Sequence, residues 1–453
     1  MLDGCTPWPE VFADRYRAAG HWRGHTLDDL LRGCVLLYGS RTALVQGDTR
    51  LTYAQLNRRV ERMAAGFRLR GLRPGQRVVV QLPNVPELVI TAFALVRAGT
   101  IPVFCPVTHR EPQVSHATRV TEAAGYVGPS VHDGFDHRGM AADIAARWPF
   151  LRRVFTYEPP HTASPYGGLA TDPSGCHYFP LGSIDAPPDR PLVRSADEVA
   201  FFLVSADSAG TPRLVPRTHD DYAYQVRAAA ESAALAEGDV YLAAPSAEFT
   251  LTLGCPGIIG TLMAGGTVVQ AETGTPAECL ALVERERVTH TSLAPGVVRH
   301  WLRELPASGV DLGSLRLVQL DGASAEELGT ALACHVQRVH AMPEGLLILA
   351  PASEPHGRPL SPDDEIRIVD TEGKDVPEGE PGELLVRGPH TVRGYYRASD
   401  LNARSFTDDG YFRTGAVARF TSPAGAGASV KTRCLRLDIA PRRDEGHRSV
   451  SGI

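Results

Sequence analysis

Residues 201–219, FFLVSADSAGTPRLVPRTH, have the residue types of a loop that holds phosphate. A predicted strand, Phe201 to Val204, runs into small and hydroxyl residues, then Gly-Thr-Pro and the cation Arg213. Glycine and hydroxyl residues let backbone N–H groups crowd around an anion, and a cation adds to the attraction. The stretch therefore predicts contacts to a phosphate group from its backbone, its hydroxyls and Arg213.

Asp207 is the residue in this loop that argues against phosphate binding. Two unit charges ~4 Å apart interact by about 4 kcal/mol at an effective dielectric of about 20. A carboxylate that faces a triphosphate would therefore lower the affinity for ATP, unless Mg²⁺ or a turn intervened. The other interpretation is that Asp207 caps a turn and points into solvent.

Residues 71–107 predict the kind of sheet that positions this loop. They give a turn, a β-branched strand, a turn with proline, an apolar helix closed by Ala98-Gly99 and a second strand. The same alternation returns in residues 238–270 and 315–349. A repeated strand–helix–strand order predicts an α/β protein with mostly parallel sheets covered by helices.

Changes in composition predict four regions along the chain. The first α/β subdomain, 1–190, ends in a connection rich in proline, glycine, serine and histidine. The second, 191–355, carries the phosphate-loop-like stretch, and a small β subdomain with short alternating strands follows in 356–420. Residues 421–453 show no amphipathic period, which predicts an unstructured or loosely packed tail.

Charge and cysteine content exclude several classes of protein. The 453 residues carry 46 basic and 52 acidic side chains, a formal net charge of −6, which gives no electrostatic case for nucleic acid or an anionic membrane. Eight scattered cysteines without a CxxC pair indicate neither a zinc site nor a disulfide framework. The N-terminal segment lacks a secretion signal, and Arg97, Gly99 and Pro102 interrupt the apolar stretch 88–107. We therefore expect a cytoplasmic protein with no membrane span and no nucleic-acid partner.

Several motifs occur along the chain in the following order: PWPEVFADRYRAAGHWRGHTLDDLL, LTYAQL (51–56), PGQRVVVQLPNVPE, GTPRLVPRTHDDY (210–222), YLAAPSAEFTLTLGCPGIIGTLMAGGTVV (241–269), GRPLSPDDEIRIVD and RGYYRASDLNARSFTDDGYFRTG (393–415). Together they resemble the adenylate-forming superfamily, and within it the stand-alone aryl-acid branch, the 2,3-dihydroxybenzoate– or salicylate–AMP ligases of siderophore pathways. The resemblance covers residues 1 to about 420 and implies that superfamily's large N-terminal domain of mostly parallel sheets, plus the small β subdomain. The family's mobile C-terminal domain, with its lysine, has no counterpart in residues 421–453, so we expect that domain to be absent.

The resemblance implies a reaction in two steps. An aryl carboxylate attacks the α-phosphate of ATP with release of pyrophosphate, and the acyl group then passes to the thiol of a carrier protein. Binding and charge stabilisation of the phosphates carry most of such chemistry. If this activity is retained, ATP and Mg²⁺ are the cofactors. The substrate is then an aryl or acyl small molecule, and the partner is an acyl or aryl carrier protein or a pathway enzyme.

The resemblance also assigns site residues. Glu344 is the residue that would meet Mg²⁺. The cofactor-binding set implied by the motifs is Ser205, Ser208, Gly210, Thr211, Arg213, Gly322, Ala323 and Glu344. The implied pocket for the aryl or acyl group comprises Phe249, Thr250, Leu251, Gly322 and Met342.

Several polar positions of these motifs differ in this chain. The phosphate loop lacks two of the family's glycines and one threonine hydroxyl. Thr250 stands where the family has the asparagine that hydrogen-bonds a substrate hydroxyl, and Phe249 where it has a histidine. A buried hydroxyl without its partner costs about 1–3 kcal/mol. His340 replaces an aromatic residue, and Ala416 replaces the aspartate that grips both ribose hydroxyls.

These departures leave three hypotheses. The first, favoured because polar site residues are lost from an intact scaffold, is a truncated, eroded homologue that is poor or inactive in adenylation. It would bind an aryl or acyl ligand or a carrier protein, or perform ATP-independent chemistry. The alternative is a working aryl-acid–AMP ligase in which Thr211, Arg213 and Glu344 handle ATP. The third is a new acid–base pair, Asp207 and His340, which join Glu344 as candidate catalytic residues. It requires the two side chains to lie within about 8 Å of each other.

Overall fold

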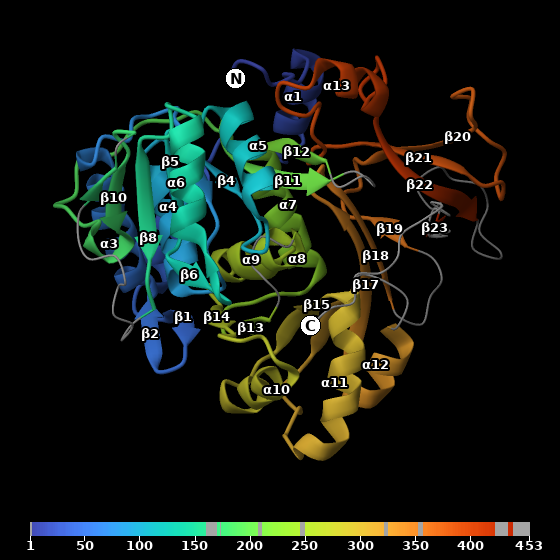
Figure 1. Ribbon diagram of the computed structural model, residues 1–453. Helices are drawn as coiled ribbons and strands as arrows, with labels where there is room; N and C mark the ends of the chain where they lie inside the picture. Colours follow the sequence, from blue (N-terminus) through green and yellow to red (C-terminus); the bar gives the residue numbers. More distant parts are fainter. Residues whose placement is uncertain are drawn as a thin grey trace.

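The computed structural model describes residues 2–159, 170–172, 174–206, 211–244, 250–320, 325–351, 357–421 and 434–437. Within these residues two large sheets form the body of the protein (Figure 1). The nine-stranded sheet has the spatial order β19 (Arg358–Pro359), β18 (Leu346–Pro351), β17 (His335–Met342), β16 (Leu317–Leu320), β15 (His290–Leu293), β13 (Val240–Ala243), β14 (Thr267–Gln270), β1 (Thr42–Gln46) and β2 (Thr49–Thr52). From β17 to β1 every pair of neighbours in this sheet is parallel.

The second large sheet has eight strands. Its spatial order is β12 (Pro212–Thr218), β11 (Val199–Ala206), β4 (Ile101–Phe104), β3 (Arg77–Val80), β5 (Gly125–Pro129), β8 (Arg153–Tyr157), β10 (His177–Pro180) and β9 (Ala170–Thr171). Its interior pairs are parallel, and only the outermost pair at each edge is antiparallel. A two-stranded hairpin, β6 (Val131–His132) and β7 (Phe135–Asp136), stands apart from it.

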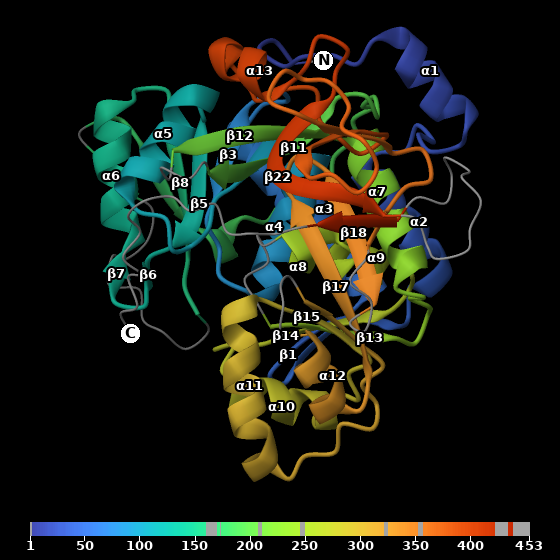
Figure 2. The ribbon, with the colours of Figure 1, turned by 90° about the vertical axis from the view of Figure 1, so that its right-hand side faces the viewer.

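Helices lie between the two large sheets and on the outer face of each (Figure 2). The helices between the sheets include α2 (Leu27–Tyr38), α3 (Tyr53–Leu69), α4 (Pro86–Arg97), α7 (His219–Ser232), α8 (Thr250–Gly254) and α9 (Gly257–Met263). The eight-stranded sheet is covered by α5 (Glu111–Thr121) and α6 (His137–Arg147), and the nine-stranded sheet by α10 (Pro276–Arg285), α11 (Pro295–Ser308) and α12 (Ala325–Leu332). The remaining helices are α1 (Glu10–Ala18), α13 (Ser399–Ser405) and a 3₁₀ turn, Leu181–Ser183.

Strand β3 shows how a continuous apolar run fits between two cores. Val78 and Val80 join the core between the two large sheets, whereas Val79 joins the core under α5 and α6. Successive side chains of a strand point to opposite faces, so the apolar run of β3 packs into a core on each side of the sheet. The predicted strand–helix–strand unit of residues 71–107 is β3, α4 and β4, and the prediction of an α/β fold with mostly parallel sheets is confirmed.

The order of strands in the sheets does not follow the order of the predicted regions. β1 and β2, from residues 1–190, belong to the nine-stranded sheet, while β11 and β12, from residues 191–355, belong to the eight-stranded one. The division of the chain at residue 190 therefore stays a prediction. Across the described residues no helix is long and apolar enough to cross a membrane, and the apolar stretch 88–107 is a buried helix followed by a buried strand.

A four-stranded antiparallel sheet completes the molecule, with the order β20 (Glu365–Val369), β21 (Gly382–Arg387), β22 (Phe412–Thr421) and β23 (Cys434–Leu437). Strand β23 lies within residues 421–453, where an unstructured or loosely packed tail was expected. It pairs with β22 through Ala418 to Thr421. Most of this stretch lies outside the described residues, so the expectation for the tail stays a prediction.

Candidate functional site

Glu344 lies where the two large sheets approach each other. It is in the turn between β17 and β18, and only 2% of it is exposed. Ser205, near the end of β11 in the other sheet, donates a hydrogen bond from Oγ to Oε1 of Glu344 at 2.7 Å. The next residue, Gly345, has φ +95°, and a Cβ there would come 1.8 Å from the carbonyl oxygen of His390. Only glycine fits this turn, which fixes Glu344 against the segment around residue 390.

Tyr395 provides a second donor to the same carboxylate oxygen. Its hydroxyl donates to Oε1 of Glu344 at 2.8 Å. Burial, and then the charge of Glu344, raises the pKa of Tyr395 above its ordinary value, so the phenol keeps its proton. Arg213 in turn donates from Nη1 to the Tyr395 hydroxyl at 3.4 Å, and its guanidinium lies 5.4 Å from the ring centre. Ser205 and Arg213 are cross-strand partners on β11 and β12, so the hairpin brings both to the carboxylate.

The other oxygen of Glu344, Oε2, is buried and accepts no hydrogen bond from any described residue. A buried carboxylate oxygen left without a donor is costly unless a cation binds it. The Mg²⁺ ion implied by the family resemblance fits this oxygen, since Mg²⁺ prefers oxygen ligands and is often held by one or two carboxylates plus substrate phosphates and water. No group of three or more His, Cys, Asp or Glu side chains in the described part of the chain could hold a metal by itself. Glu344 would therefore share the ion with a phosphate-bearing ligand.

A surface groove of about 470 Å³ opens beside Tyr395. Thr211 and Arg213, at the start of β12, form one wall. Arg119 from α5, Arg397 and Glu122 also line it, and Arg397 pairs with Glu122 at 3.1 Å. The lining thus holds three arginines against one carboxylate, that of Glu122, and this excess of positive charge suits a phosphate-bearing ligand.

Several predicted site residues lie outside the described residues: Asp207, Ser208 and Gly210 of the phosphate loop, Phe249, and the pair Gly322 and Ala323 that follows β16. His340 is on β17, opposite Ile348, and is partly buried. The distance between Asp207 and His340 is therefore not described, and the acid–base pair stays a prediction.

Thr250 and Leu251 begin α8 and are both buried. Leu251 packs in a small apolar cluster with Cys255 and with Val339 and Leu347 of β17 and β18. This cluster lies at the same pair of strands whose turn carries Glu344, so the implied acyl pocket and the carboxylate share one scaffold. Met342, at the end of β17, packs instead against the large core between the sheets.

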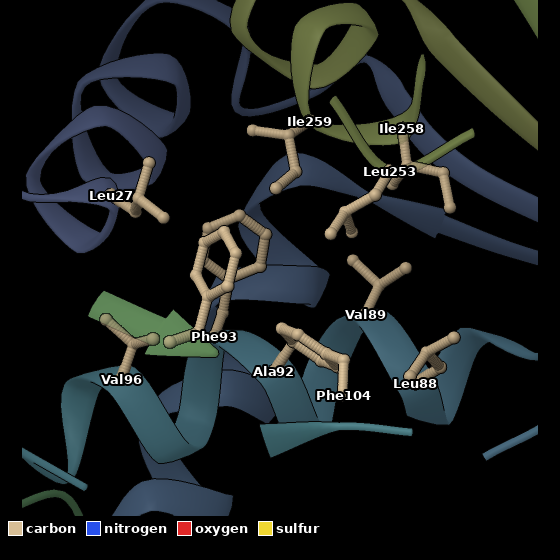
Figure 3. A pocket seen from close by; sticks show the side chains of 11 residues that line it. Leu27, Leu88, Val89, Ala92, Phe93, Val96, Phe104, Leu253, Ile258 and Ile259 are labelled. Carbon is tan, nitrogen blue, oxygen red and sulfur yellow. The ribbon is translucent and has the colours of Figure 1, made fainter. Parts of the chain in front are cut away.

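An apolar cavity of about 40 Å³ lies beside α8, with Leu253 of that helix in its lining (Figure 3). It is lined by Leu27, Leu88, Val89, Ala92, Phe93, Val96, Phe104, Phe201, Leu253, Ile258 and Ile259. Leu253 is two residues beyond Leu251, which places the two side chains on different faces of the helix. The cavity has no polar side chain in its lining and belongs to the core, not to the polar site.

Ala416 lies on β22, where the resemblance implies an aspartate that holds ribose. Its backbone N–H donates to Oγ1 of Thr414 at 3.0 Å, and its methyl group packs against the large core. A methyl group offers no hydrogen bond to a ribose hydroxyl. The site therefore combines the Glu344 carboxylate with nearby arginines, but it has no carboxylate at position 416.

Sequence reasoning missed two residues of this site. Tyr395, in the stretch RGYY, bridges Arg213 and Glu344, and Arg217, in the stretch PRTHDDY, is buried behind the turn that carries Glu344. Both residues carry only weak signals in the sequence. Arg217 falls between a predicted strand and a predicted helix, and Tyr395 belongs to a pair of tyrosines after a glycine. Only their contacts with distant segments reveal a role.

Comparisons with known proteins define the class of enzyme to which this chain belongs. The sequence profile of the family described as "AMP-binding enzyme" matches residues 35–396. This chain therefore belongs to the AMP-binding enzyme family, and the resemblance to the adenylate-forming superfamily is confirmed.

Individual relatives narrow the class to its aryl-acid branch. The chain is 39% identical to a 2,3-dihydroxybenzoate-AMP ligase of Bacillus subtilis, over 93% of this chain and 78% of that protein. It is 37% identical to a salicyl-AMP ligase / salicyl-S-ArCP synthetase of Mycobacterium tuberculosis, over 100% of this chain and 77% of that protein. Among solved structures, the apo structure of MbtA from Mycobacterium smegmatis matches with a TM-score of 0.84 at 36% identity, covering 96% of this chain and 79% of that one.

Proposed function

We propose that this protein activates an aryl carboxylic acid with ATP and Mg²⁺, forming an aryl adenylate and pyrophosphate. The observation that carries the proposal is the buried oxygen Oε2 of Glu344, which has no donor among the described residues while Oε1 is held by Ser205 and Tyr395. The relatives named as aryl-acid–AMP ligases support a working ligase better than the eroded homologue that the sequence departures favoured.

In the proposed reaction an oxygen of the substrate carboxylate forms a bond to the α-phosphorus, and the bond from that phosphorus to the leaving oxygen breaks. Glu344 would hold Mg²⁺, which supplies charge neutralisation at the phosphate oxygens when bound. Arg213 offers positive charge to the phosphates from the groove beside Tyr395. Tyr395 keeps the Glu344 carboxylate oriented, because its protonated hydroxyl donates to one oxygen and leaves the other for the cation.

The substrate we propose is a hydroxybenzoate-like acid. Its ring would lie against Leu251 and Cys255, which are apolar and buried, with Thr250 as the polar group at the edge of the pocket. The relatives named for 2,3-dihydroxybenzoate and salicylate support this class. The relative named salicyl-S-ArCP synthetase supports an aryl carrier protein as the acceptor of the acyl group.

The direct test is exchange of radiolabelled pyrophosphate into ATP with a panel of salicylate, 2,3-dihydroxybenzoate and benzoate. We expect exchange with at least one hydroxybenzoate and its loss when a chelator removes Mg²⁺. If no acid supports exchange, either alone or with an aryl carrier protein added, the proposal is rejected and the eroded homologue is the better explanation.

The alanine at position 416 allows a sharper form of this test. A carboxylate that accepts hydrogen bonds from two ribose hydroxyls contributes about 1.5–3 kcal/mol per bond. We therefore expect Ala416→Asp to lower the KM for ATP by about tenfold or more. Ala416→Asn, similar in size but uncharged, is the control and should give a smaller gain. An unchanged KM in both variants would show that this position does not contact the ribose.

A further inference from the structure

Arg217 is a completely buried arginine on β12, and a guanidinium keeps its positive charge in proteins. Its hydrogen bonds run from Nε to Oδ1 of Asp221 (2.8 Å), from Nη1 to the carbonyl of Pro343 (3.0 Å), and from Nη2 to Oε1 of Gln225 (3.0 Å) and the carbonyl of His390 (3.1 Å). A buried charge is tolerated only when its hydrogen bonds are satisfied in this way. The side chain is therefore held in one position by three separate segments.

Two of these partners belong to the segments that place Glu344. Pro343 directly precedes Glu344 in the turn between β17 and β18. His390 is close to Val392, whose N–H donates to the carbonyl oxygen of Glu344 at 2.9 Å. Arg217 thus binds the carbonyl that directly precedes Glu344 and a carbonyl of the segment whose Val392 pairs with the Glu344 backbone. No hydrogen bond joins its side chain to the Glu344 carboxylate.

The helix α7 anchors the other end of this arrangement. Oδ2 of Asp221 accepts hydrogen bonds from the N–H and the hydroxyl of Thr218, both at 2.7 Å, and these cap the start of α7. Oδ1 is thereby left for Arg217. Each oxygen of Asp221 thus has its own donor, Arg217 for Oδ1 and Thr218 for Oδ2, which fixes the orientation of the carboxylate toward the guanidinium.

Gln225 connects the same arginine to the wall of the implied acyl pocket. Its Oε1 accepts from Arg217, which directs its Nε2 toward Sγ of Cys255, at 3.0 Å. Burial raises the pKa of Cys255 to about 12, so the thiol stays neutral and serves as a hydrogen-bond partner. Cys255 packs on Leu251 in the small apolar cluster. A continuous chain of contacts therefore runs from the Glu344 turn through Arg217 and Gln225 to α8.

We propose that Arg217 is a positioning residue that couples the carboxylate for Mg²⁺ to the acyl pocket. This inference rests on the proposed function. Arg217 holds the carbonyl of Pro343 beside Glu344 and that of His390 in the segment that pairs with Glu344, and it orients Gln225 toward Cys255. Occupancy of one half of the site therefore favours the geometry of the other. Its effect is exerted through these residues, without contact to substrate.

The test compares Arg217→Lys with a matched control, Arg97→Lys. Arg97 is also buried and paired, with Asp28, but it lies among α2, α3 and α4. A lysine keeps the charge and loses the fork of N–H donors in both variants. Hydrogen–deuterium exchange should rise at least about tenfold in residues 339–347 and 250–255 of Arg217→Lys. In Arg97→Lys these segments should match the wild type. Unchanged exchange in Arg217→Lys, or an equal rise in both variants, would overturn the proposal.

Kinetics give the second measurement. In pyrophosphate exchange, Arg217→Lys should raise both the Mg²⁺ concentration for half-maximal activity and the KM for the aryl acid, each by about tenfold. Gln225→Leu, which interrupts only the link to Cys255, should raise the KM for the acid and leave the Mg²⁺ dependence unchanged. A fall in kcat alone, with both concentration dependences intact, would contradict coupling. If the wild type shows no exchange of pyrophosphate, the proposed function fails, and the amide exchange alone still decides whether Arg217 positions these segments.

Discussion

Arg97 and Arg217 are both buried and both paired with an aspartate, yet they connect different kinds of structure. Arg97 lies at the end of α4 and donates to Asp28 of α2 at 2.6 Å and to the carbonyl of Asn57 of α3 at 3.4 Å. All three helices lie between the two large sheets. Arg217 lies on an edge strand and reaches one helix and two turns that belong to other parts of the fold.

The two aspartates also differ in how much water reaches them. The side chain of Asp28 is 15% exposed and has a second ion-pair partner, Arg32, at 2.9 Å. The side chain of Asp221 is 4% exposed and depends on Arg217 for its countercharge. The comparison teaches that a buried ion pair can serve helix packing or the alignment of distant segments. The residues that the ion pair contacts, rather than its burial, decide which of these two roles it has.

The largest expected effect comes from removing each arginine. Arg217→Met leaves Asp221 buried without a countercharge, which costs about 3–5 kcal/mol of unfolding free energy. Arg97→Met should cost less, about 1–3 kcal/mol, because Arg32 and partial exposure still serve Asp28. Urea denaturation of the two variants measures the difference. A greater loss for Arg97→Met would refute this reading of the two aspartates.

The next effect concerns one carboxylate in each region, Glu344 beside the turn that Arg217 holds and Asp28 beside Arg97. Glu344→Gln keeps an oxygen for Ser205 and Tyr395 but removes the charge at Oε2. We expect pyrophosphate exchange to fall by about 10²–10³-fold, as for the loss of one electrostatic group in an active site. Asp28→Asn is the control and should leave the rate per folded molecule unchanged. Similar rates for Glu344→Gln and the wild type would exclude Glu344 as the carboxylate for Mg²⁺.

A smaller, pH-dependent effect is expected from His219, which connects the two regions. Its Nδ1 accepts from the N–H of Leu27, at the start of α2. Burial, with a further contribution from Arg194, lowers its pKa from 6.5 to about 4. The unfolded chain then binds the proton more readily, so stability is fully present above pH 6.5 and declines as the pH falls to about 4.

His219→Asn keeps an acceptor for Leu27 and cannot be protonated in this range. The loss of unfolding free energy between pH 6.5 and pH 4 should therefore shrink by up to about 3 kcal/mol in this variant. Urea denaturation across that pH range measures it. An acid-induced loss identical to that of the wild type would show that His219 is protonated in the folded protein.

The smallest effect is expected at the apolar cavity beside α8. Ala92→Met places a flexible apolar side chain into the 40 Å³ space and should gain up to about 1 kcal/mol of unfolding free energy. Phe93→Leu, which enlarges the same cavity, is the opposite control and should lose about 1 kcal/mol or more. Thermal unfolding followed by circular dichroism measures both. A destabilised Ala92→Met would mean that the lining cannot give way to the added atoms.

The strand–helix–strand units were predictable because their signals are local. Residues 77–104 show a β-branched run, then an apolar stretch long enough for a helix, and then Ala98-Gly99, where Gly99 has φ +78°. Helix α8 was not predicted, because five residues after a loop carry too short a pattern. Glu344 was identified from its motif, whereas its partners Ser205 and Tyr395 come from segments 139 and 51 residues away, and no local pattern records such contacts.

By itself the sequence determined the α/β class, the family, and the residue types that could meet a nucleotide, since apolar periodicity and motif order are properties of neighbouring residues. The tertiary structure decided which oxygen of Glu344 is left open, which side chains hold the other, and where a buried guanidinium directs its donors. Those features depend on where strands from two sheets meet in space. Their directional hydrogen bonds join residues that are far apart along the chain.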